Sequence, residues 1–304
     1  MMPKPLVSIV IVNWNGGALL LNCIQSVLQS SYQNYEIIIV DNASNDQSIA
    51  LIPKTSQIHI ISNKTNMGFA YACNQGASDS KGEYILFLNP DTQLLKETLT
   101  DSVDFMECNT KYQVLGVKNI DLEGNVDPSC GRLPKPLRFV TESFRLSKLW
   151  PNIFLPATLM NDWDHLTSKC VEQVIGAYFF IRRKAFNYLD GFDSDFFVYY
   201  EEVDLCKRLK DNNNLIFYNS KIVVKHVKNG TTSNIKDIRL FYSLRSRLQY
   251  SKKHFRTIEH LIVSFFTLFV EPASRILYFL LKGDISSIKE SVKGYKLLYI
   301  SIFE

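Results

Sequence analysis

The sequence lacks the cysteine spacings of a zinc finger or of a redox pair. Its six cysteines are scattered over 304 residues, and no two of them form a CxxC motif. The apolar run in the N-terminal stretch MMPKPLVSIVIV is too short for a secretory segment and leads directly into a strand-like block. We therefore expect reduced thiols and a cytoplasmic protein.

Glycine-rich phosphate-binding loops are also missing. The sequence contains neither GxGxxG nor GxxxxGKS/T. These loops hold phosphate through their backbone N–H groups, so their absence excludes a dinucleotide site of the Rossmann kind and a P-loop. The sequence also has no internal repeat and no low-complexity tract. Any phosphate-bearing ligand must be held in another way.

Acidic residues are scarce in the last quarter of the chain. From residue 221 onward, 15 Lys or Arg face 6 Asp or Glu, a net charge of +9, whereas the first 220 residues carry 19 and 24, a net charge of −5. This asymmetry indicates different partners for the two ends. The basic residues of the tail alternate with Leu, Ile and Phe and do not gather beside stacking aromatics, so binding to nucleic acid is not expected.

Strand-like and helix-like segments alternate in the first third of the chain. This spacing predicts right-handed βαβ units, and hence an α/β protein with a parallel sheet covered on both faces. The expected strands are 6–13, 36–40, 58–62 and 84–88, and the expected helices are 17–31, 44–52 and 67–80.

The rest of the chain predicts a second set of elements, with no linker dividing residues 1–230. The prolines between Cys130 and Pro156 indicate a loop, and residues 174–181 form an apolar segment. The other expected elements are strands near 113–118, 215–218 and 222–226, a helix over 198–211, and helices from 236 onward.

Polar clusters follow each of the first four expected strands. They are NWNGG from Asn13, DNAS from Asp41, residues 63–68, and Asn89-Pro90-Asp91. The carboxyl ends of strands are where ligands bind in open α/β sheets, so four clusters at one edge predict a polar crevice. Asp91 alone could be an ordinary turn residue. It could equally bind Mg²⁺ or Mn²⁺, which need only one or two protein carboxylates besides substrate phosphates.

Two further candidates lie late in the chain. In FFVYYEEVDLCKRL, from Phe196, the acids Glu201, Glu202 and Asp204 open a helix, where acids are favourable for the helix dipole alone. The neighbouring aromatic rings could instead line a sugar site and keep one carboxylate basic enough to accept a proton. His226 ends the run KIVVKHV; it is either an ordinary satisfied histidine or a metal ligand beside Asp91.

Five motifs in this order and spacing resemble family 2 of the glycosyltransferases, and within it the rhamnosyltransferase-type branch that builds bacterial surface polysaccharides. They are VSIVIVNWNGG, IIIVDNASND, NMGFAYACNQG, LFLNPDT and FFVYYEEVDLCKRL, and the resemblance covers residues 6 to about 255. It implies the GT-A fold over 1–235, with a nucleotide-binding half, 1–110, and an acceptor-binding half, 111–235. Residues 236–304 would form a helical extension.

The resemblance also implies roles for individual residues. Asp41 would hydrogen-bond the pyrimidine base, and Asn89-Pro90-Asp91 occupies the place of the family's DxD motif, with Asn89 in place of the first Asp. Gly176 would border the donor sugar. The residues assigned to the donor are Asn13, Asn15, Asp41, Asn66, Asn89 and Gly176.

The metal ligands implied by the resemblance are Asp91 and His226, and the implied catalytic base is Glu202. The family's usual Glu-Asp pair appears here as Glu201-Glu202, a departure that lengthens the base by one methylene. Glu201 and Asp204 therefore remain alternatives for the base.

The implied activity is transfer of a sugar, with inversion, from a nucleoside diphosphate sugar in the presence of Mg²⁺ or Mn²⁺. dTDP-rhamnose and a UDP-hexose are both open as donors, and the acceptor would be a glycan or a polyprenyl-diphosphate-linked sugar. One alternative is a nucleotide-sugar-binding subunit that has lost catalysis. Another is a nucleotidyltransferase, against which the late acids and His226 argue.

An apolar segment, LIVSFFTLFVEPASRILYFLL over 261–281, is as long as a membrane-spanning helix. Glu271, Pro272 and Arg275 interrupt it, and Lys or Arg residues flank it on both sides. This pattern favours a peripheral element on an anionic membrane surface, which would place the protein at the inner face of the plasma membrane. A buried helix or a dimer contact is the alternative.

Overall fold

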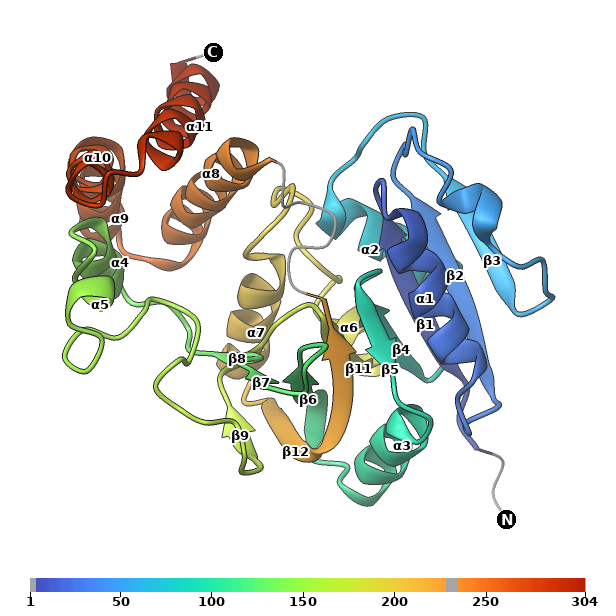
Figure 1. Ribbon diagram of the computed structural model, residues 1–304. Coiled ribbons are helices and arrows are strands. Elements are labelled where there is room, and N and C mark those ends of the chain that lie inside the picture. Colours follow the sequence, from blue (N-terminus) through green and yellow to red (C-terminus); the bar gives the residue numbers. More distant parts are fainter. Residues whose placement is uncertain (1–3, 228–234, 304) are drawn as a thin grey trace. The chain divides into compact units, whose positions relative to one another are not determined.

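The computed structural model describes residues 4–227 and 235–303, which form two compact units (Figure 1). The first unit contains residues 4–131, 163–197 and 201–227, and the second contains 132–162, 198–200 and 235–303. The segment from Gly230 to Ser233, which follows His226 in the sequence, lies outside the described residues. Each unit is described on its own below.

The first unit is built on a mixed sheet of ten strands in its described part (Figure 1). Along the sheet the order is β3-β2-β1-β4-β11-β6-β12-β5, with β7 paired to β6 and β9 to β12. The strands are β1 (Val7–Asn13), β2 (Tyr35–Asp41), β3 (Ile58–Ser62), β4 (Tyr84–Leu88), β5 (Thr92–Leu94), β6 (Tyr112–Ile120), β7 (Val126–Asp127), β9 (Lys169–Val171), β11 (Tyr178–Arg182) and β12 (Leu215–His226). A separate antiparallel pair joins β8 (Cys130–Gly131) to β10 (Gln173–Val174).

Helices cover both faces of this sheet. Because side chains alternate along a strand, Ile9 and Ile11 of β1 pack in one core with α1 and α3. Val10 points the other way, against Gly76 of α2, where a Cβ would come within 2.5 Å of it. The helices of this unit are α1 (Gly17–Leu28), the short 3₁₀ helix η1 (Ile49–Leu51), α2 (Phe69–Asp79), α3 (Thr98–Cys108), α6 (Arg183–Tyr188) and α7 (Glu201–Asp211).

The four predicted N-terminal strands are confirmed, and β3, β2, β1 and β4 run parallel. The sheet is not parallel throughout, however. β11 is inserted antiparallel between β4 and β6, so the apolar segment 174–181 is divided between β10 and β11. β6 and β12 then run parallel to each other and to β4, which brings the carboxyl ends of β1, β2, β4 and β12 to one edge.

Three predicted elements are wrong in extent. The expected helix 44–52 is reduced to η1, because Ser44 and Ser48 are held by hydrogen bonds to Asn13. The expected helix 198–211 begins only at Glu201, since Tyr199 and Tyr200 have positive φ angles of 67° and 70°. The two strands expected over 215–226 are one strand, β12, with an irregularity between Asn219 and Val223.

The second unit is helical. It contains α4 (Pro136–Ser143), α5 (Leu146–Leu149), α8 (Lys236–His254), α9 (Thr257–Phe265), the π-helical η2 (Phe266–Val270), α10 (Glu271–Leu281) and α11 (Ile285–Phe303). The helices from 236 onward are confirmed. The loop expected between Cys130 and Pro156 is wrong over α4 and α5, because Pro136 starts α4 at a helix position that needs no N–H donor. α4 packs against α9, η2 and α10, so residues 132–162 belong with the C-terminal helices.

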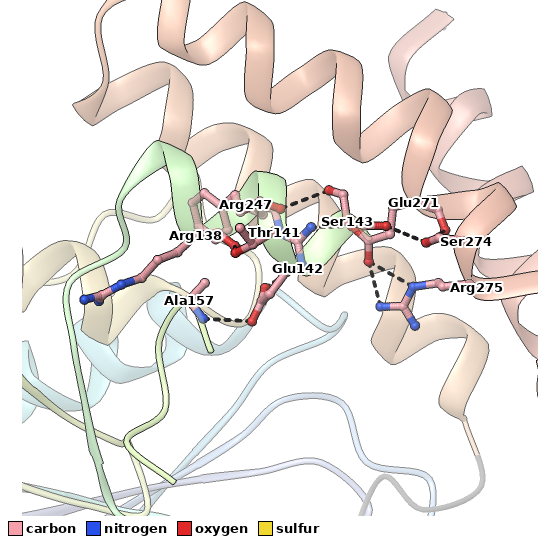
Figure 2. Close-up of polar contacts among 10 residues, drawn as sticks. Arg138, Thr141, Glu142, Ser143, Ala157, Arg247, Glu271, Ser274 and Arg275 are labelled. Carbon is pink, nitrogen blue, oxygen red and sulfur yellow. Dashed lines mark hydrogen bonds and ion pairs between the residues drawn. The ribbon is translucent and has the colours of Figure 1, made fainter. Parts of the chain in front are cut away.

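Buried charges hold this helical unit together (Figure 2). Arg247 of α8 donates from Nη1 to Glu271 Oε2 at 2.5 Å, and Arg275 donates from Nε to Glu271 Oε1 at 2.9 Å. The Nη2 atom of Arg247 lies 3.4 Å from Glu142 Oε2 on α4. The Glu271 side chain is 3% exposed and that of Arg247 is 7% exposed. The charges that interrupt the apolar sequence therefore point into the unit.

The run α9–η2–α10 exposes apolar side chains. By length and composition alone, Thr257–Leu281 is the one described helix that could cross a membrane, and 17% of its apolar window is buried. The large side chains that it leaves exposed are Ile258, Leu261, Ile262, Phe265, Phe269, Leu277, Leu280 and Leu281.

Candidate functional site

The carboxyl ends of β1 and β2 carry a buried polar network. Asn13 donates from Nδ2 to Asp41 Oδ1 at 2.8 Å and lies within 2.9 Å of both Ser44 Oγ and Ser48 Oγ. Asp41 Oδ2 accepts from the N–H of Ser44 at 3.2 Å. Asn15, with φ of 52°, accepts from the N–H of Asn45 through Oδ1 at 2.8 Å. The sheet edge thus fixes Asp41, Asn13 and Asn15, three of the residues assigned to the donor pocket.

A second amide network follows β3 and shapes the start of α2. Asn42 donates from Nδ2 to Asn66 Oδ1 at 2.8 Å and to Gly68 O at 3.1 Å. Asn66 Oδ1 also accepts from the N–H of Gly68 at 3.0 Å. Asn66 therefore lies at the expected edge, where its carbonyl oxygen holds the turn before α2.

Gly68 lets the loop before α7 approach the start of α2. The N–H of Phe69 donates to Phe197 O at 2.5 Å, and a Cβ on Gly68 would lie 2.6 Å from the same oxygen. Burial and the nearby charges of Glu201 and Glu202 raise the pKa of the Cys73 thiol on α2. The glutamate pair at the start of α7 is thus held beside the first turns of α2.

Gly68→Ala is expected to destabilise the first unit by about 2–4 kcal/mol, because it adds both a positive-φ penalty and a clash with Phe197. Gly124 is the matched control: it has the same φ of 88°, and a Cβ there would meet no atom within 4 Å. Gly124→Ala should therefore cost only about 1 kcal/mol, the conformational part alone. Urea unfolding of both variants measures the difference. Equal costs would contradict the close approach of Phe197.

The end of β4 adjoins the segment before β11. The N–H of Asn89 donates to Ala177 O at 3.2 Å, which places Gly176 and Ala177 beside the Asn89-Pro90-Asp91 turn. At Gly176 an added Cβ would meet no atom within 4 Å. Asn89 and Gly176, assigned to the donor from the sequence, are thus neighbours, and the backbone at Gly176 faces open space.

Asp91, His226 and Asp127 lie together at the same edge. His226 Nε2 lies 3.5 Å from Asp91 Oδ1, and His226 Nδ1 lies 3.5 Å from Asp127 Oδ2. Pairing of β5 with β12 sets Thr92 opposite His226, and the N–H of Val227 donates to Asp91 O at 2.9 Å. The sequence analysis missed Asp127. It sits on the two-residue strand β7, opposite Asn119, and no motif or spacing marks it.

Two carboxylates flank His226 in this group. Burial acts to lower the pKa of His226, but the neighbouring carboxylates of Asp127 and Asp91 outweigh it and raise the pKa to about 9. The imidazole would therefore have to lose a proton before it could bind a metal. Asp91 Oδ1 is buried and has no hydrogen-bond partner among the described residues. A hard cation could satisfy this oxygen. Within those residues, no group of three or more His, Cys, Asp or Glu side chains is arranged to hold a metal ion.

The glutamate pair opens α7. Burial raises the pKa of Glu201 well above its usual value, with a further contribution from the neighbouring charge of Glu202. Burial also raises the pKa of Glu202, whereas backbone N–H groups at the helix start and the Glu201 carboxyl favour its ionised form. The stronger rise at Glu201 favours its protonated form beside the Glu202 carboxylate.

Asp204 has a different task. Its Oδ2 accepts from Arg208 Nε at 2.8 Å, and the other nitrogens of Arg208 donate to Leu189 O at 2.6 Å and to Gly191 O at 2.8 Å. Asp204 is fully buried. It therefore anchors α7 to the segment after α6, and the glutamates are the carboxylates of this cluster that fit a proton acceptor.

Comparison with known proteins shows which family the sequence resembles. The sequence model described as "Glycosyl transferase family 2" matches residues 8–158. An uncharacterized glycosyltransferase of Haemophilus influenzae is 36% identical over 129 residues, which are 41% of this chain and 52% of that protein. The N-acetylglucosaminyl-diphospho-decaprenol L-rhamnosyltransferase of Mycobacterium tuberculosis is 24% identical over 236 residues, which are 74% and 76% of the two chains.

Among solved structures, mannosyltransferase PcManGT from Pyrobaculum calidifontis, in complex with GDP-Man and Mn²⁺, aligns with a TM-score of 0.58 at 12% identity. The alignment covers 97% of this chain and 81% of that one, and at this identity it speaks for the fold alone. Three bacterial glycosyltransferases at 32% to 36% identity match over only part of their length, and the alignments span 37% to 52% of those proteins. The chain has the GT-A fold, and its residues 8–158 belong to glycosyltransferase family 2.

Proposed function

We propose that the protein is an inverting glycosyltransferase that moves a sugar from a nucleoside diphosphate donor to a glycan or a polyprenyl-diphosphate-linked acceptor. The observation that carries this proposal is the buried Asp91 Oδ1, which has no hydrogen-bond partner among the described residues and lies 3.5 Å from His226 Nε2. It belongs to the same sheet edge as Asp41. A diphosphate needs such a charge-neutralising group in a chain without a glycine-rich phosphate loop.

The residues of the first unit take distinct roles in this reaction. Asp41, oriented by Asn13, accepts hydrogen bonds from the pyrimidine base of the donor. Glu202 accepts the proton of an acceptor hydroxyl, whose oxygen attacks the anomeric carbon from the face opposite the leaving nucleotide. Glu201 keeps the Glu202 carboxylate oriented through their shared proton. A bound Mg²⁺ or Mn²⁺, held by Asp91 and His226, would neutralise charge on the departing diphosphate.

The favoured donor is dTDP-rhamnose, and a UDP-hexose is the alternative. The name of the mycobacterial relative, an L-rhamnosyltransferase acting on a decaprenol diphosphate, supports both the sugar and the lipid-linked acceptor at 24% identity. A subunit that binds the donor without catalysis is the second candidate, since Glu stands where the family has Asp. Turnover that depends on Glu202 distinguishes the enzyme from such a subunit.

The proposal includes a peripheral membrane location at the cytoplasmic face. The run α9–η2–α10 exposes large apolar side chains, while its charged residues Glu271 and Arg275 are paired inside the helical unit. This arrangement supports a helix that lies in the membrane interface, where a lipid-linked acceptor would be reached.

A donor-binding panel tests this proposal. UDP- and dTDP-sugars are titrated with Mg²⁺, with Mn²⁺ and with chelator, on the wild type, on Asp91→Asn and on the control Asp79→Asn, an exposed carboxylate that pairs with His59. We expect metal-dependent binding of one donor, weakened about a hundredfold or more in Asp91→Asn, as expected for loss of a metal ligand. The control should bind like the wild type. Binding that ignores both the metal and Asp91 would make Asp91 an ordinary turn residue.

A further inference from the structure

The helical unit carries a cluster of cations around Tyr278 of α10. The guanidinium carbon of Arg145 lies 4.2 Å from the centre of the Tyr278 ring and 4.9 Å from that of Phe279. The Nζ atom of Lys282 lies 4.8 Å from the Tyr278 ring. Arg275 precedes Tyr278 on the same helix, and Lys148 follows Arg145 in α5. Two separate segments of the unit thus bring their positive charges to one aromatic residue.

Positive charge in this cluster is poorly compensated. Arg145 is 5% exposed, and its Nε is buried without a hydrogen-bond partner among the described residues. Burial and the charge of Arg275 lower the pKa of Arg145. Partial desolvation and the charges of Arg145 and Arg275 likewise lower the pKa of Lys148. Glu271 also acts on Arg145, but its carboxylate already pairs with Arg247 and Arg275.

Apolar side chains border the cluster on both segments. Leu149, Trp150 and Ile153, which follow Lys148, are 51%, 53% and 71% exposed. Leu280 and Leu281, which precede Lys282, are 59% and 81% exposed. Cations between exposed apolar and aromatic residues match the region of a bilayer where phosphate groups meet acyl chains. A free phosphate ion would gain nothing from contact with these apolar side chains, whereas a lipid would bury them.

We propose that Arg145, Lys148, Arg275 and Lys282 form a binding site for the phosphate group of an anionic membrane lipid. The phosphate would lie against the buried Arg145 guanidinium, while Trp150, Ile153 and Leu281 enter the interface beside it. Planar guanidinium groups suit phosphate oxygens, and the two lysines add charge at the rim. The site is made by the second unit alone and does not depend on the donor chemistry proposed for the first.

Vesicle co-sedimentation of the full chain tests this site. Partition is measured on phosphatidylcholine vesicles with and without phosphatidylglycerol, for the wild type and for Lys148→Gln/Lys282→Gln. Both lysines are exposed, so this variant should fold. The control, Lys293→Gln/Lys296→Gln, removes the same charge from exposed positions on α11. We expect partition to need phosphatidylglycerol and to weaken about twenty-five-fold in the cluster variant, at about fivefold per basic residue. Adding Arg145→Gln should weaken it further.

Three outcomes would overturn the proposal. If partition is the same with and without phosphatidylglycerol, membrane binding does not depend on an anionic headgroup. Equal weakening in the cluster variant and in the control would mean diffuse attraction without a site. Calorimetric binding of inorganic phosphate that depends on Lys148 and Lys282, without partition to vesicles, would assign the cluster to a free anion. Donor binding, measured on the same preparations, should be unchanged in every variant, so failure of the lipid site is distinguishable from failure of the proposed transferase function.

Discussion

Glu202→Gln is expected to lower kcat for sugar transfer by about 10²- to 10⁴-fold, the usual contribution of a positioned general base. Gln has nearly the same size but cannot accept the proton of the acceptor hydroxyl. Donor affinity should stay within about twofold, because the proposed donor contacts lie on other elements than α7 and an interaction made only in the transition state changes kcat. Single-turnover rates and donor-binding titrations on the same preparation measure the two effects.

Glu201→Gln is the matched control for this experiment. The amide of Gln can still donate a hydrogen bond to the Glu202 carboxylate, as Glu201 would in its favoured protonated form. Most of the activity should therefore survive. If Glu201→Gln is inactive and Glu202→Gln is active, the general base is Glu201 and not Glu202. Loss of donor binding in Glu202→Gln would instead indicate a collapsed site.

The pH profile of the wild type follows from the same pair. Burial raises the pKa of Glu202 above its usual value, and the carboxylate is the active form in the proposed mechanism. As the pH falls through that raised pKa, Glu202 becomes protonated and kcat/KM drops. The acid limb of the profile should therefore lie above the value of about 4.3 that is typical of a free glutamate.

Glu271→Gln is expected to destabilise the helical unit by about 3–5 kcal/mol, because it removes the nearest counter-charge of the buried Arg247 and leaves only Glu142, 3.4 Å away. Glu290→Gln is the control: Glu290 lies 3.6 Å from Lys236, both partners are partly exposed, and loss of this surface pair should cost no more than about 1 kcal/mol. Urea unfolding measures both. Hydrogen exchange in α8 and α10 shows whether the loss is confined to the second unit.

A double substitution sharpens that test. Arg247→Met/Glu271→Met removes both buried charges together and should recover much of the lost stability, because well-packed apolar residues can replace a buried ion pair. If Glu271→Gln costs no more than Glu290→Gln, the charges of Figure 2 do not hold the helices together.

The sequence predicted the first four strands well because each is a short, strongly apolar run bounded by turn residues. β3 and β4 begin and end at the expected residues. The sequence also placed Asp91 and His226 as a pair, and they lie 3.5 Å apart. The antiparallel β11 was not foreseen, since a buried run of residues carries no mark of its direction in a sheet.

The missed features depend on contacts between residues far apart in sequence. Asp127 reaches His226 only through the register of β7 and β12 around β6. In the sequence, Glu271 is a charge that interrupts an apolar segment. Its partner Arg247 lies on another helix, 24 residues away in sequence, so local sequence patterns do not reveal the pair. The helix 44–52 failed because the hydroxyls of Ser44 and Ser48 bond to Asn13 across the sheet edge.

The helical unit is discontinuous in sequence, and this has a consequence for how the protein is made. Residues 132–162 leave the ribosome well before 235–303, the part of the unit that packs around them. In the interval, the side of α4 that carries Phe139 and Ser143, both fully buried in the finished fold, has no neighbouring helices to cover it. The nascent chain therefore exposes an aggregation-prone apolar surface while the strands from β9 to β12 are synthesised. Chaperones would have to protect that surface until the last helices emerge.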